Sequence, residues 1–169
     1  MPRNIEIQAR ITGVESLLPQ ARALADGEPV TIEQDDSLFV APQGRLKLRQ
    51  FADSSAELIH YHSAYSPDTK ASDNVRVPGP DPAALREALA RTCGLLGRVR
   101  KQRLLLMAGI TCIHLDRVAG LRDFMELEVF LADGQSDAEG AAVAEALMDA
   151  LGLADAHRLA GSYLDLMQR

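Results

Sequence analysis

The fold of this chain is decided by short stretches in which charged and apolar residues alternate: Arg45-Leu-Lys47-Leu-Arg49, His114-Leu-Asp116 and Glu126-Leu-Glu128. Successive side chains of a β-strand point to opposite faces, so each stretch places its charges on one face and its leucines on the other. Some of these ionic faces are basic and others are acidic. The pattern predicts a β-lined cavity that holds a polyanion together with the divalent metal that neutralises it.

The composition indicates one domain with a local anion site. The chain has 169 residues, of which 47% are hydrophobic, and this suffices for one sizeable core over residues 1–169. The net charge of -6 argues against nucleic acid and anionic membranes as partners, because both need a basic surface. No apolar run reaches the roughly 20 residues of a membrane span, and the polar start Met-Pro-Arg-Asn is unlike a signal peptide. We therefore expect a cytoplasmic protein.

The spacing of apolar residues predicts an α+β protein. Strands are expected at residues 5–11, 30–33, 38–50 with an interruption at Pro-Gln-Gly, 57–62, 74–77, 97–107, 110–118 and 124–132. Helices are expected over residues 14–24, after the N-cap candidate Asp81, after the capping box of Ser136 and Glu139, and around Tyr163. The helix after Ser136 should bury Val143, Ala146, Leu147, Ala150 and Leu151. About eight antiparallel strands tend to close, so we expect an eight-stranded barrel with peripheral helices.

Carboxylates are concentrated on the later strands. Glu126 and Glu128 share one face of their strand, and Asp116 shares a face with His114 on the strand before it. Carboxylates that converge inside a barrel repel one another and are costly to desolvate, so they persist mainly where a cation binds. Oxygen ligands suit Mg²⁺ or Mn²⁺, which complete their shells with water and substrate phosphates. The alternative is that this polar face is simply exposed to solvent.

Cations alternate on two other strands. Arg45, Lys47 and Arg49 repel one another unless an anion or acidic partners lie opposite, and arginine matches phosphate oxygens bidentately. Lys101 and Arg103 alternate in the same way further along the chain. The alternative is an outer face that pairs with the protein's own Asp and Glu residues.

Other chemistries have weaker support in the sequence. His60 and His62 share a face and could bind zinc, but the sequence offers no matching third ligand, so a surface or cavity-lining pair is favoured. Cys112 lies in an apolar run, where the role of a small buried hydrophobe is expected. Gly-rich phosphate loops are absent from the sequence, so phosphate would be held by side chains.

Six short segments, in order along nearly the whole chain, resemble one family: Asn4-Ile-Glu6-Ile-Gln8-Ala-Arg10, Gly44-Arg-Leu-Lys-Leu-Arg49, Glu57-Leu-Ile59, His114-Leu-Asp116, Phe124-Met-Glu-Leu-Glu128 and Gly161-Ser-Tyr-Leu-Asp165. Together they are similar to the CYTH superfamily, also called the triphosphate tunnel metalloenzymes, which includes class IV adenylyl cyclases and thiamine triphosphatases. The resemblance implies an eight-stranded antiparallel barrel with an open tunnel lined by charged residues.

The resemblance also implies which residues form the site. The metal, Mg²⁺ or Mn²⁺, would be held by Glu6, Asp116, Glu126 and Glu128. The cations that bind phosphate and act in catalysis would be Lys47, Arg49 and Arg103, with Arg45 and Lys101 as neighbours and Lys70 as a looser match. We also expect Tyr163, with His60 and His62, at the tunnel mouth, where such residues can orient a leaving group.

Two residues depart from the family's N-terminal Glu-x-Glu-x-Lys motif. The first Glu is Asn4 in this chain and the Lys is Gln8, so one negative and one positive charge are lost together. Asn4 can still bind a metal through its carbonyl oxygen, and Gln8 can hydrogen-bond a phosphate without neutralising it. The loss of a charge-assisted bond to phosphate costs roughly 1.5–3 kcal/mol.

The sequence therefore predicts metal-dependent hydrolysis of a triphosphate: a nucleoside triphosphate, thiamine triphosphate or inorganic tripolyphosphate. Cyclisation of ATP to cyclic AMP and pyrophosphate ranks lower, because water needs no contacts that orient a base and a sugar. Two alternatives stay open, namely a non-catalytic module that binds a phosphorylated ligand and a structural domain with solvated charges. The expected partner is a small triphosphate-containing molecule, and the sequence is compatible with a homodimer.

Overall fold

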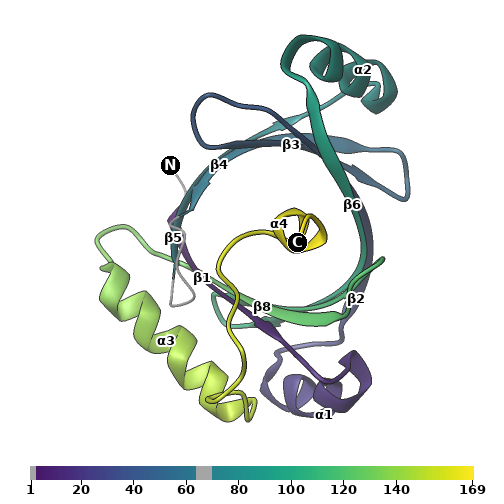
Figure 1. Cartoon of the computed structure of the whole chain (residues 1–169). Helices are drawn as coiled ribbons and strands as arrows, with labels where there is room; N and C mark the ends of the chain where they lie inside the picture. The colour runs from purple at the N-terminus through teal and green to yellow at the C-terminus, as the bar shows by residue number, and fades with distance from the viewer. Residues whose placement is uncertain (1–2, 64–69) are drawn as a thin grey trace.

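The computed structural model describes residues 3–63 and 70–169, and within them eight antiparallel strands close into a barrel in the order β1-β5-β4-β3-β2-β6-β7-β8 (Figure 1). The strands are β1 (Arg3–Arg10), β2 (Val30–Phe39), β3 (Arg45–Phe51), β4 (Ala56–Ser63), β5 (Lys70–Pro78), β6 (Leu95–Ala108), β7 (Thr111–Val118) and β8 (Asp123–Phe130). The helices are α1 (Val14–Leu24), α2 (Pro82–Cys93), α3 (Asp137–Ala150) and α4 (Tyr163–Met167). The expected α+β class and eight-stranded closed barrel are confirmed.

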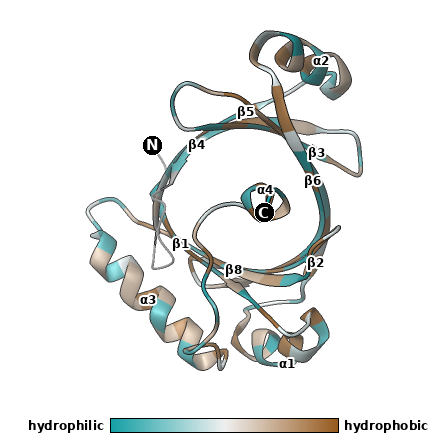
Figure 2. Cartoon of the chain, viewed as in Figure 1, coloured by the Kyte–Doolittle hydropathy of each residue, from teal (hydrophilic) through white to brown (hydrophobic). Residues whose placement is uncertain are grey.

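The main apolar core lies outside the barrel wall, between the wall and two helices. Ile5 and Ile7 of β1 and Leu127 of β8 point outward and are almost fully buried against α1 and α3. Figure 1 shows both helices on the outer side of β1 and β8, and Figure 2 shows hydrophilic and hydrophobic residues together along the strands. Because the apolar residues of these strands face outward, the polar residues that alternate with them face the barrel interior.

Two smaller apolar clusters complete the fold. Helix α2 covers the outer side of β3 near Leu48, with Leu85 and Leu89 against the wall. Helix α4 projects inside the ring of strands in the view along the barrel (Figure 1), and its Tyr163 and Leu164 are buried in an interior cluster. One end of the barrel is thus filled by apolar side chains. None of the described helices combines the length and apolar character that a membrane crossing requires.

Most helix ends agree with the sequence signals. Asp81 caps α2 with its side chain on the Ala84 amide, and Ser136 and Glu139 form the expected capping box at the start of α3. The expected apolar stripe of α3 is wrong in part, because Ala146 and Ala150 are exposed.

Helix α3 is instead buried through Gly140, Ala144 and Met148. The reason is close packing, since a Cβ on Gly140 would lie only 2.8 Å from Cγ1 of Ile5. The helix turns its smallest residue toward the wall.

Strand β2 is longer than expected and is the main correction to the expected elements. The sequence stops this strand at Glu33, because the acidic run that follows has no apolar alternation. In the structure β2 continues to Phe39, with Asp35 outside and Asp36 inside the barrel. The expected strand over residues 38–50 is therefore the end of β2, a Pro-Gln-Gly turn and β3.

Candidate functional site

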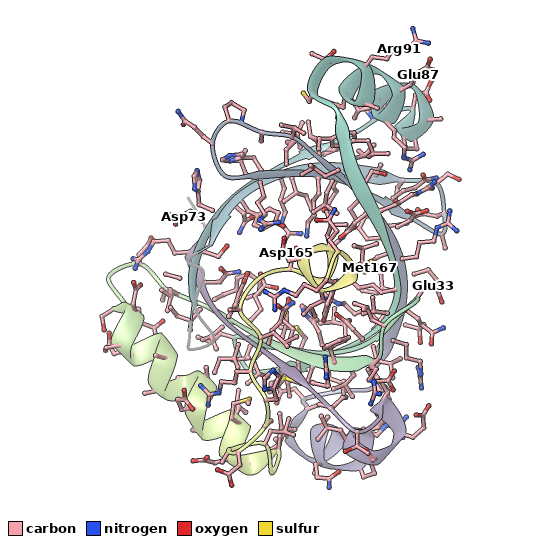
Figure 3. The ribbon with its side chains drawn as sticks, viewed as in Figure 1. Glu33, Asp73, Glu87, Arg91, Asp165 and Met167 are labelled. Carbon is pink, nitrogen blue, oxygen red and sulfur yellow. The ribbon has the colours of Figure 1, made fainter. Side chains whose placement is uncertain are left out.

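The inner face of the barrel carries most of the charged residues that the sequence singles out. A cavity of about 120 Å³ lies inside the barrel. Among the residues that line it are Glu6, Gln8, Arg45, Lys47, Arg49, Lys101, Arg103, Glu126, Glu128 and Tyr163. Figure 3 shows side chains filling the ring of strands, with Asp165 of α4 inside it. The alternative of a solvated or outer polar face is therefore wrong, because these charges line a chamber inside the barrel.

Two buried arginines are each clamped by an aspartate on the neighbouring strand. Arg49 donates from Nε to Oδ1 of Asp36 at 2.8 Å and from Nη2 to Oδ2 at 2.7 Å. Arg103 makes the same pair of bonds to Asp116, both at 2.7 Å. Each pair is directly opposite in register, β2 with β3 and β6 with β7. Such bidentate clamping fixes the guanidinium planes. Among the described residues Nη1 of each arginine has no hydrogen-bond partner, so it can meet a ligand.

A lysine accompanies each of these pairs. Lys47 Nζ lies 3.6 Å from Asp36 Oδ2, and Lys101 Nζ lies 3.5 Å from Asp116 Oδ2. Lys47 sits over the ring of Tyr61 and Lys101 over the ring of Tyr163, each 4.9 Å from the centroid. Each unit thus has two basic side chains for one carboxylate, which makes this side of the chamber basic.

Burial has strong effects on the pKa values of these groups. Burial and then the charge of Arg49 lower the pKa of Lys47 to about 7, and burial and then Arg103 lower that of Lys101 to about 8. Burial would raise the pKa of Asp36, but Arg49 and Lys47 outweigh it and hold that pKa well below its usual range. An incoming anion would stabilise the charged forms of both lysines.

The opposite side of the chamber is acidic and is formed by β1 and β8. Glu6 is directly opposite Glu128 in register, an arrangement that is unfavourable for two carboxylates without a cation. Gln8 Nε2 donates to Glu126 Oε2 at 2.9 Å, and the Asn4 amide donates to Glu128. The two residues that depart from the family motif thus hold the two glutamates of β8.

One buried atom indicates that this acidic side suits a cation. Asn4 is 1% exposed, and its Oδ1 has no hydrogen-bond partner among the described residues. An unpaired buried carbonyl oxygen is costly, and a metal ion is one partner that would satisfy it. Glu6, Glu126 and Glu128 line this side of the chamber. Carboxylate and amide oxygens are the ligand type that Mg²⁺ and Mn²⁺ prefer.

Asp116 is part of the same chamber but its carboxylate is occupied. Its Oδ2 accepts from the hydroxyl of Tyr163 at 2.8 Å, and Arg103 binds both of its oxygens. Burial would raise the pKa of Asp116, but Lys101 and Arg103 outweigh it and keep the group ionised. In this structure Asp116 therefore positions Arg103 and Tyr163.

The remaining expected residues differ in their placement. Arg45 reaches α4, where Nη2 donates to Asp165 Oδ2 at 2.9 Å. Tyr163 lines the chamber and is buried in the barrel, and burial and then Asp116 raise its pKa well above the usual value. Lys70 begins β5 opposite Glu6 in register, but its side chain lies outside the described part of the structure.

Sequence reasoning missed Asp36 and misplaced two histidines. Asp36 is hidden in an unbroken polar run, so no alternation signals its inward direction. His60 and His62 lie outside the chamber, because Ile59 and Tyr61 occupy the inward positions of β4. Their rings are 5.2 Å apart on the outer face. The polar residue at the tunnel wall is Tyr61 instead.

The fold and site together define a class of protein: an eight-stranded antiparallel barrel with an ionic chamber that is basic on one side and acidic on the other. The chain belongs to the CYTH domain family, whose model matches residues 2–163. The resemblance found in the sequence is thereby confirmed. No curated protein sequence matches the chain significantly.

Solved structures show the same fold at low sequence identity. A protein of Pyrococcus horikoshii has a TM-score of 0.84 and 20% identity, over 96% of this chain and 98% of that one. A Vibrio parahaemolyticus protein, provisionally described as an adenylate cyclase, has a TM-score of 0.79 and 18% identity, over 98% of both chains. HpAC1 from Hippeastrum, described with a dominant triphosphatase activity, has a TM-score of 0.69 and 15% identity, over 99% of this chain and 95% of that one.

Proposed function

We propose that this protein is a divalent-metal-dependent enzyme that hydrolyses a triphosphate inside the barrel. The observation that carries the proposal is the division of one buried chamber into a cationic side, on β3 and β6, and a carboxylate side, on β1 and β8. A triphosphate with its metal has the complementary charges. Membership of the CYTH domain family and the triphosphatase activity described for the Hippeastrum protein support the same chemistry.

The cationic side would bind and orient the phosphates. Arg49 and Arg103 are held by Asp36 and Asp116, so little side-chain entropy is lost when their free Nη1 groups meet non-bridging oxygens. Burial lowers the pKa of Lys47, so this lysine loses its proton easily in the free protein. A bound phosphate would raise that pKa and restore the positive charge. These fixed donors stabilise the charge that develops on the phosphoryl oxygens in the transition state.

The acidic side would hold Mg²⁺ or Mn²⁺ through Glu6, Glu126 and Glu128, with Asn4 Oδ1 as a neutral ligand. When bound, the metal neutralises phosphate charge and polarises the phosphoryl group. Gln8 positions Glu126 by its hydrogen bond. Asp116 would join the metal only if its bonds to Arg103 and Tyr163 were released, so its role here is to position them.

Hydrolysis is favoured over cyclisation by the contents of the chamber. Cyclisation of ATP needs contacts that place the base and the ribose 3′-hydroxyl. Tyr61 and Tyr163, which line the chamber, already have lysines over their rings. Water attack on the terminal phosphorus makes no such demand.

The second candidate is a receptor that binds triphosphate without turnover. Asn4 and Gln8 favour this candidate, because the family pattern has charged groups at these two positions. Their side-chain amides instead donate hydrogen bonds to Glu128 and Glu126, respectively. Metal-dependent turnover separates the enzyme from the receptor.

The test is phosphate release from ATP, thiamine triphosphate and tripolyphosphate with Mg²⁺ or Mn²⁺, with cyclic AMP measured in the same reactions. We expect turnover of at least one substrate only with metal, and a loss on the order of 100-fold in Glu126→Gln. Glu33→Gln is the matched control, because Glu33 is exposed and points away from the barrel (Figure 3). Binding of triphosphate without phosphate release would support the receptor.

A further inference from the structure

A second cavity opens at the other end of the barrel, beyond Arg49 and Arg103, and has a volume of about 630 Å³. Its lining combines apolar side chains such as Phe51 and Leu105 with polar ones that include Arg76 and Arg103. Three further lining residues carry atoms that can bind a metal: Cys112, His114 and Glu128. The mechanism proposed above does not use the first two.

The three side chains are placed as a ligand set. The Cys112 sulfur, a nitrogen of His114 and an oxygen of Glu128 all lie within 4.8 Å of one another. The exposed fractions of the three residues are 8%, 5% and 7%, so all three are largely buried in the wall of the cavity. Such a Cys, His and carboxylate set is typical of zinc and is unsuited to Mg²⁺, which takes oxygen ligands.

The β-register holds these residues together without any loop. Cys112 and His114 are two residues apart on β7, and Cys112 is directly opposite Glu128 of β8. On the other side Cys112 is opposite Met107 of β6, and its sulfur lies 3.4 Å from the Met107 sulfur. A thioether is a further soft donor within reach of the same position.

Neighbouring groups already orient the ligand atoms. His114 Nδ1 lies 3.3 Å from Glu126 Oε1. The tautomer with its hydrogen on Nδ1 donates to this carboxylate and leaves the lone pair of Nε2 for a metal. A histidine that is bound on one nitrogen by a carboxylate and on the other by a metal is a common arrangement in zinc sites. The Asn4 amide donates to one oxygen of Glu128, and the second oxygen has no hydrogen-bond partner among the described residues.

We propose that Cys112, His114 and Glu128, with Met107 beside them, form a second metal site that takes a thiophilic divalent ion such as Zn²⁺. The ion would bind the Cys112 thiolate, His114 Nε2 and the free oxygen of Glu128. As the sulfur–zinc bond forms, the thiol proton leaves to solvent, so binding releases one proton. The proposal concerns binding alone and stands whether or not the chamber hydrolyses triphosphate.

One consequence of the site does rest on the proposed function. Glu128 belongs to both ligand sets, so a Zn²⁺ ion on Cys112 would withdraw one carboxylate from Mg²⁺ in the chamber. Zn²⁺ would then inhibit the Mg²⁺-dependent reaction, and the inhibition would be relieved in Cys112→Ser.

The direct test is titration of the metal-free full chain with Zn²⁺ by calorimetry, together with absorption spectroscopy after loading with Co²⁺. We expect one tight Zn²⁺ per chain and a sulfur-to-cobalt charge-transfer band. Cys112→Ser should weaken Zn²⁺ binding by at least about 100-fold and abolish the band. Cys93→Ser is the matched control, because Cys93 lies at the end of α2, and it should keep both signals.

Two further variants complete the test. If Cys112→Ser does not fold by circular dichroism, Cys112→Ala replaces it with the same expectation. A double variant His60→Asn/His62→Asn removes the histidine pair on the outer face and should leave the cobalt band unchanged. Zn²⁺ binding that survives in the Cys112 variants, or that is lost only in the histidine double variant, would overturn the proposal.

Discussion

At the scale of single residues, the chamber depends on aspartates that hold arginines. Asp36 and Asp116 are 4% and 0% exposed, and each neutralises one buried guanidinium while leaving its lysine in excess. Removal of one partner from a buried ion pair leaves an uncompensated charge, which costs far more than the pair contributes. These aspartates should therefore matter for stability as well as for anion binding.

Asp36→Asn should lower the free energy of unfolding by roughly 3–5 kcal/mol, because Arg49 and Lys47 lose their buried partner. Asp35→Asn is the control at the adjacent position, where the aspartate pairs with Arg98 on the outer surface. We expect Asp35→Asn to lower the free energy of unfolding by only about 0–1 kcal/mol. Urea unfolding of the two variants measures the difference, and equal losses would contradict the burial of the Asp36 unit.

Binding of a polyanion should lead to protonation of Lys47. The pKa of Lys47 is lowered to about 7, so at pH 9 the free protein has a neutral lysine there. A bound triphosphate raises that pKa, and the complex takes up a proton. Calorimetry of tripolyphosphate binding without metal, in buffers of different ionisation enthalpy, should show this uptake at pH 9.

In Lys47→Met the proton uptake should fall by about one per site. Arg100→Met is the control on the outer face, where Arg100 lies 3.4 Å from Asp35, and it should keep the uptake of the native protein. Identical uptake in Lys47→Met and the native protein would show that Lys47 is not the group that titrates.

At the scale of elements, strand alternation made much of the site predictable. The placement of Arg45, Lys47 and Arg49 on one face follows directly from the period of two. Their inward direction was left open by the alternation and is decided by the packing of Leu48 against α2 outside the wall. Asp36 could not be found in this way, because Glu33-Gln-Asp-Asp is polar on both faces of β2. The direction of that strand is decided by its pairing with β3 and β6, a long-range effect.

The carboxylate side of the chamber was predictable only through the family resemblance. Glu126-Leu-Glu128 alone is compatible with a solvated strand, and nothing local relates it to Glu6, which is more than a hundred residues away. The closure of the barrel makes β1 and β8 neighbours. The meeting of Cys112 with His114 and Glu128 depends on the pairing of β7 with β8, so His-x-His spacing could not reveal it.

Helix α4 should stabilise the barrel through Leu164, which packs inside it. Leu164→Ala should lower the free energy of unfolding by roughly 2–5 kcal/mol, because a cavity would be left among buried apolar side chains. Met167→Ala is the control on the same helix, since Met167 is 37% exposed, and should change stability by less than about 0.5 kcal/mol. If urea unfolding shows equal losses of unfolding free energy in the two variants, Leu164 is not packed inside the barrel.

At the scale of the whole molecule, the barrel has its apolar core outside the wall and its charges inside. The stability of such a protein should depend on pH at the acidic end. The pKa values of Asp36, Asp116 and Glu126 lie below their usual range, because nearby cations outweigh the effect of burial. Groups of this kind stabilise the folded state above the unfolded pKa of about 4, and that contribution is lost as the pH falls.

The free energy of unfolding should thus decrease steeply as the pH is lowered below about 4.5. The slope should be smaller in Asp36→Asn, which has one fewer carboxylate to protonate. Urea unfolding between roughly pH 3 and pH 7 measures both slopes. If the free energy of unfolding of the native protein stays constant down to about pH 3, these carboxylates are not ion-paired in the folded state.

The inner face of the barrel should bind a triphosphate together with its metal, and this is the central claim. The most direct test is a crystal structure of the full chain grown with tripolyphosphate and Mn²⁺, with the metal located by its anomalous signal. We expect a manganese peak beside Glu126 and Glu128 and phosphate oxygens on Arg49 and Arg103. Tripolyphosphate bound instead to the outer arginines Arg98 and Arg100, with no manganese inside the barrel, would contradict the claim.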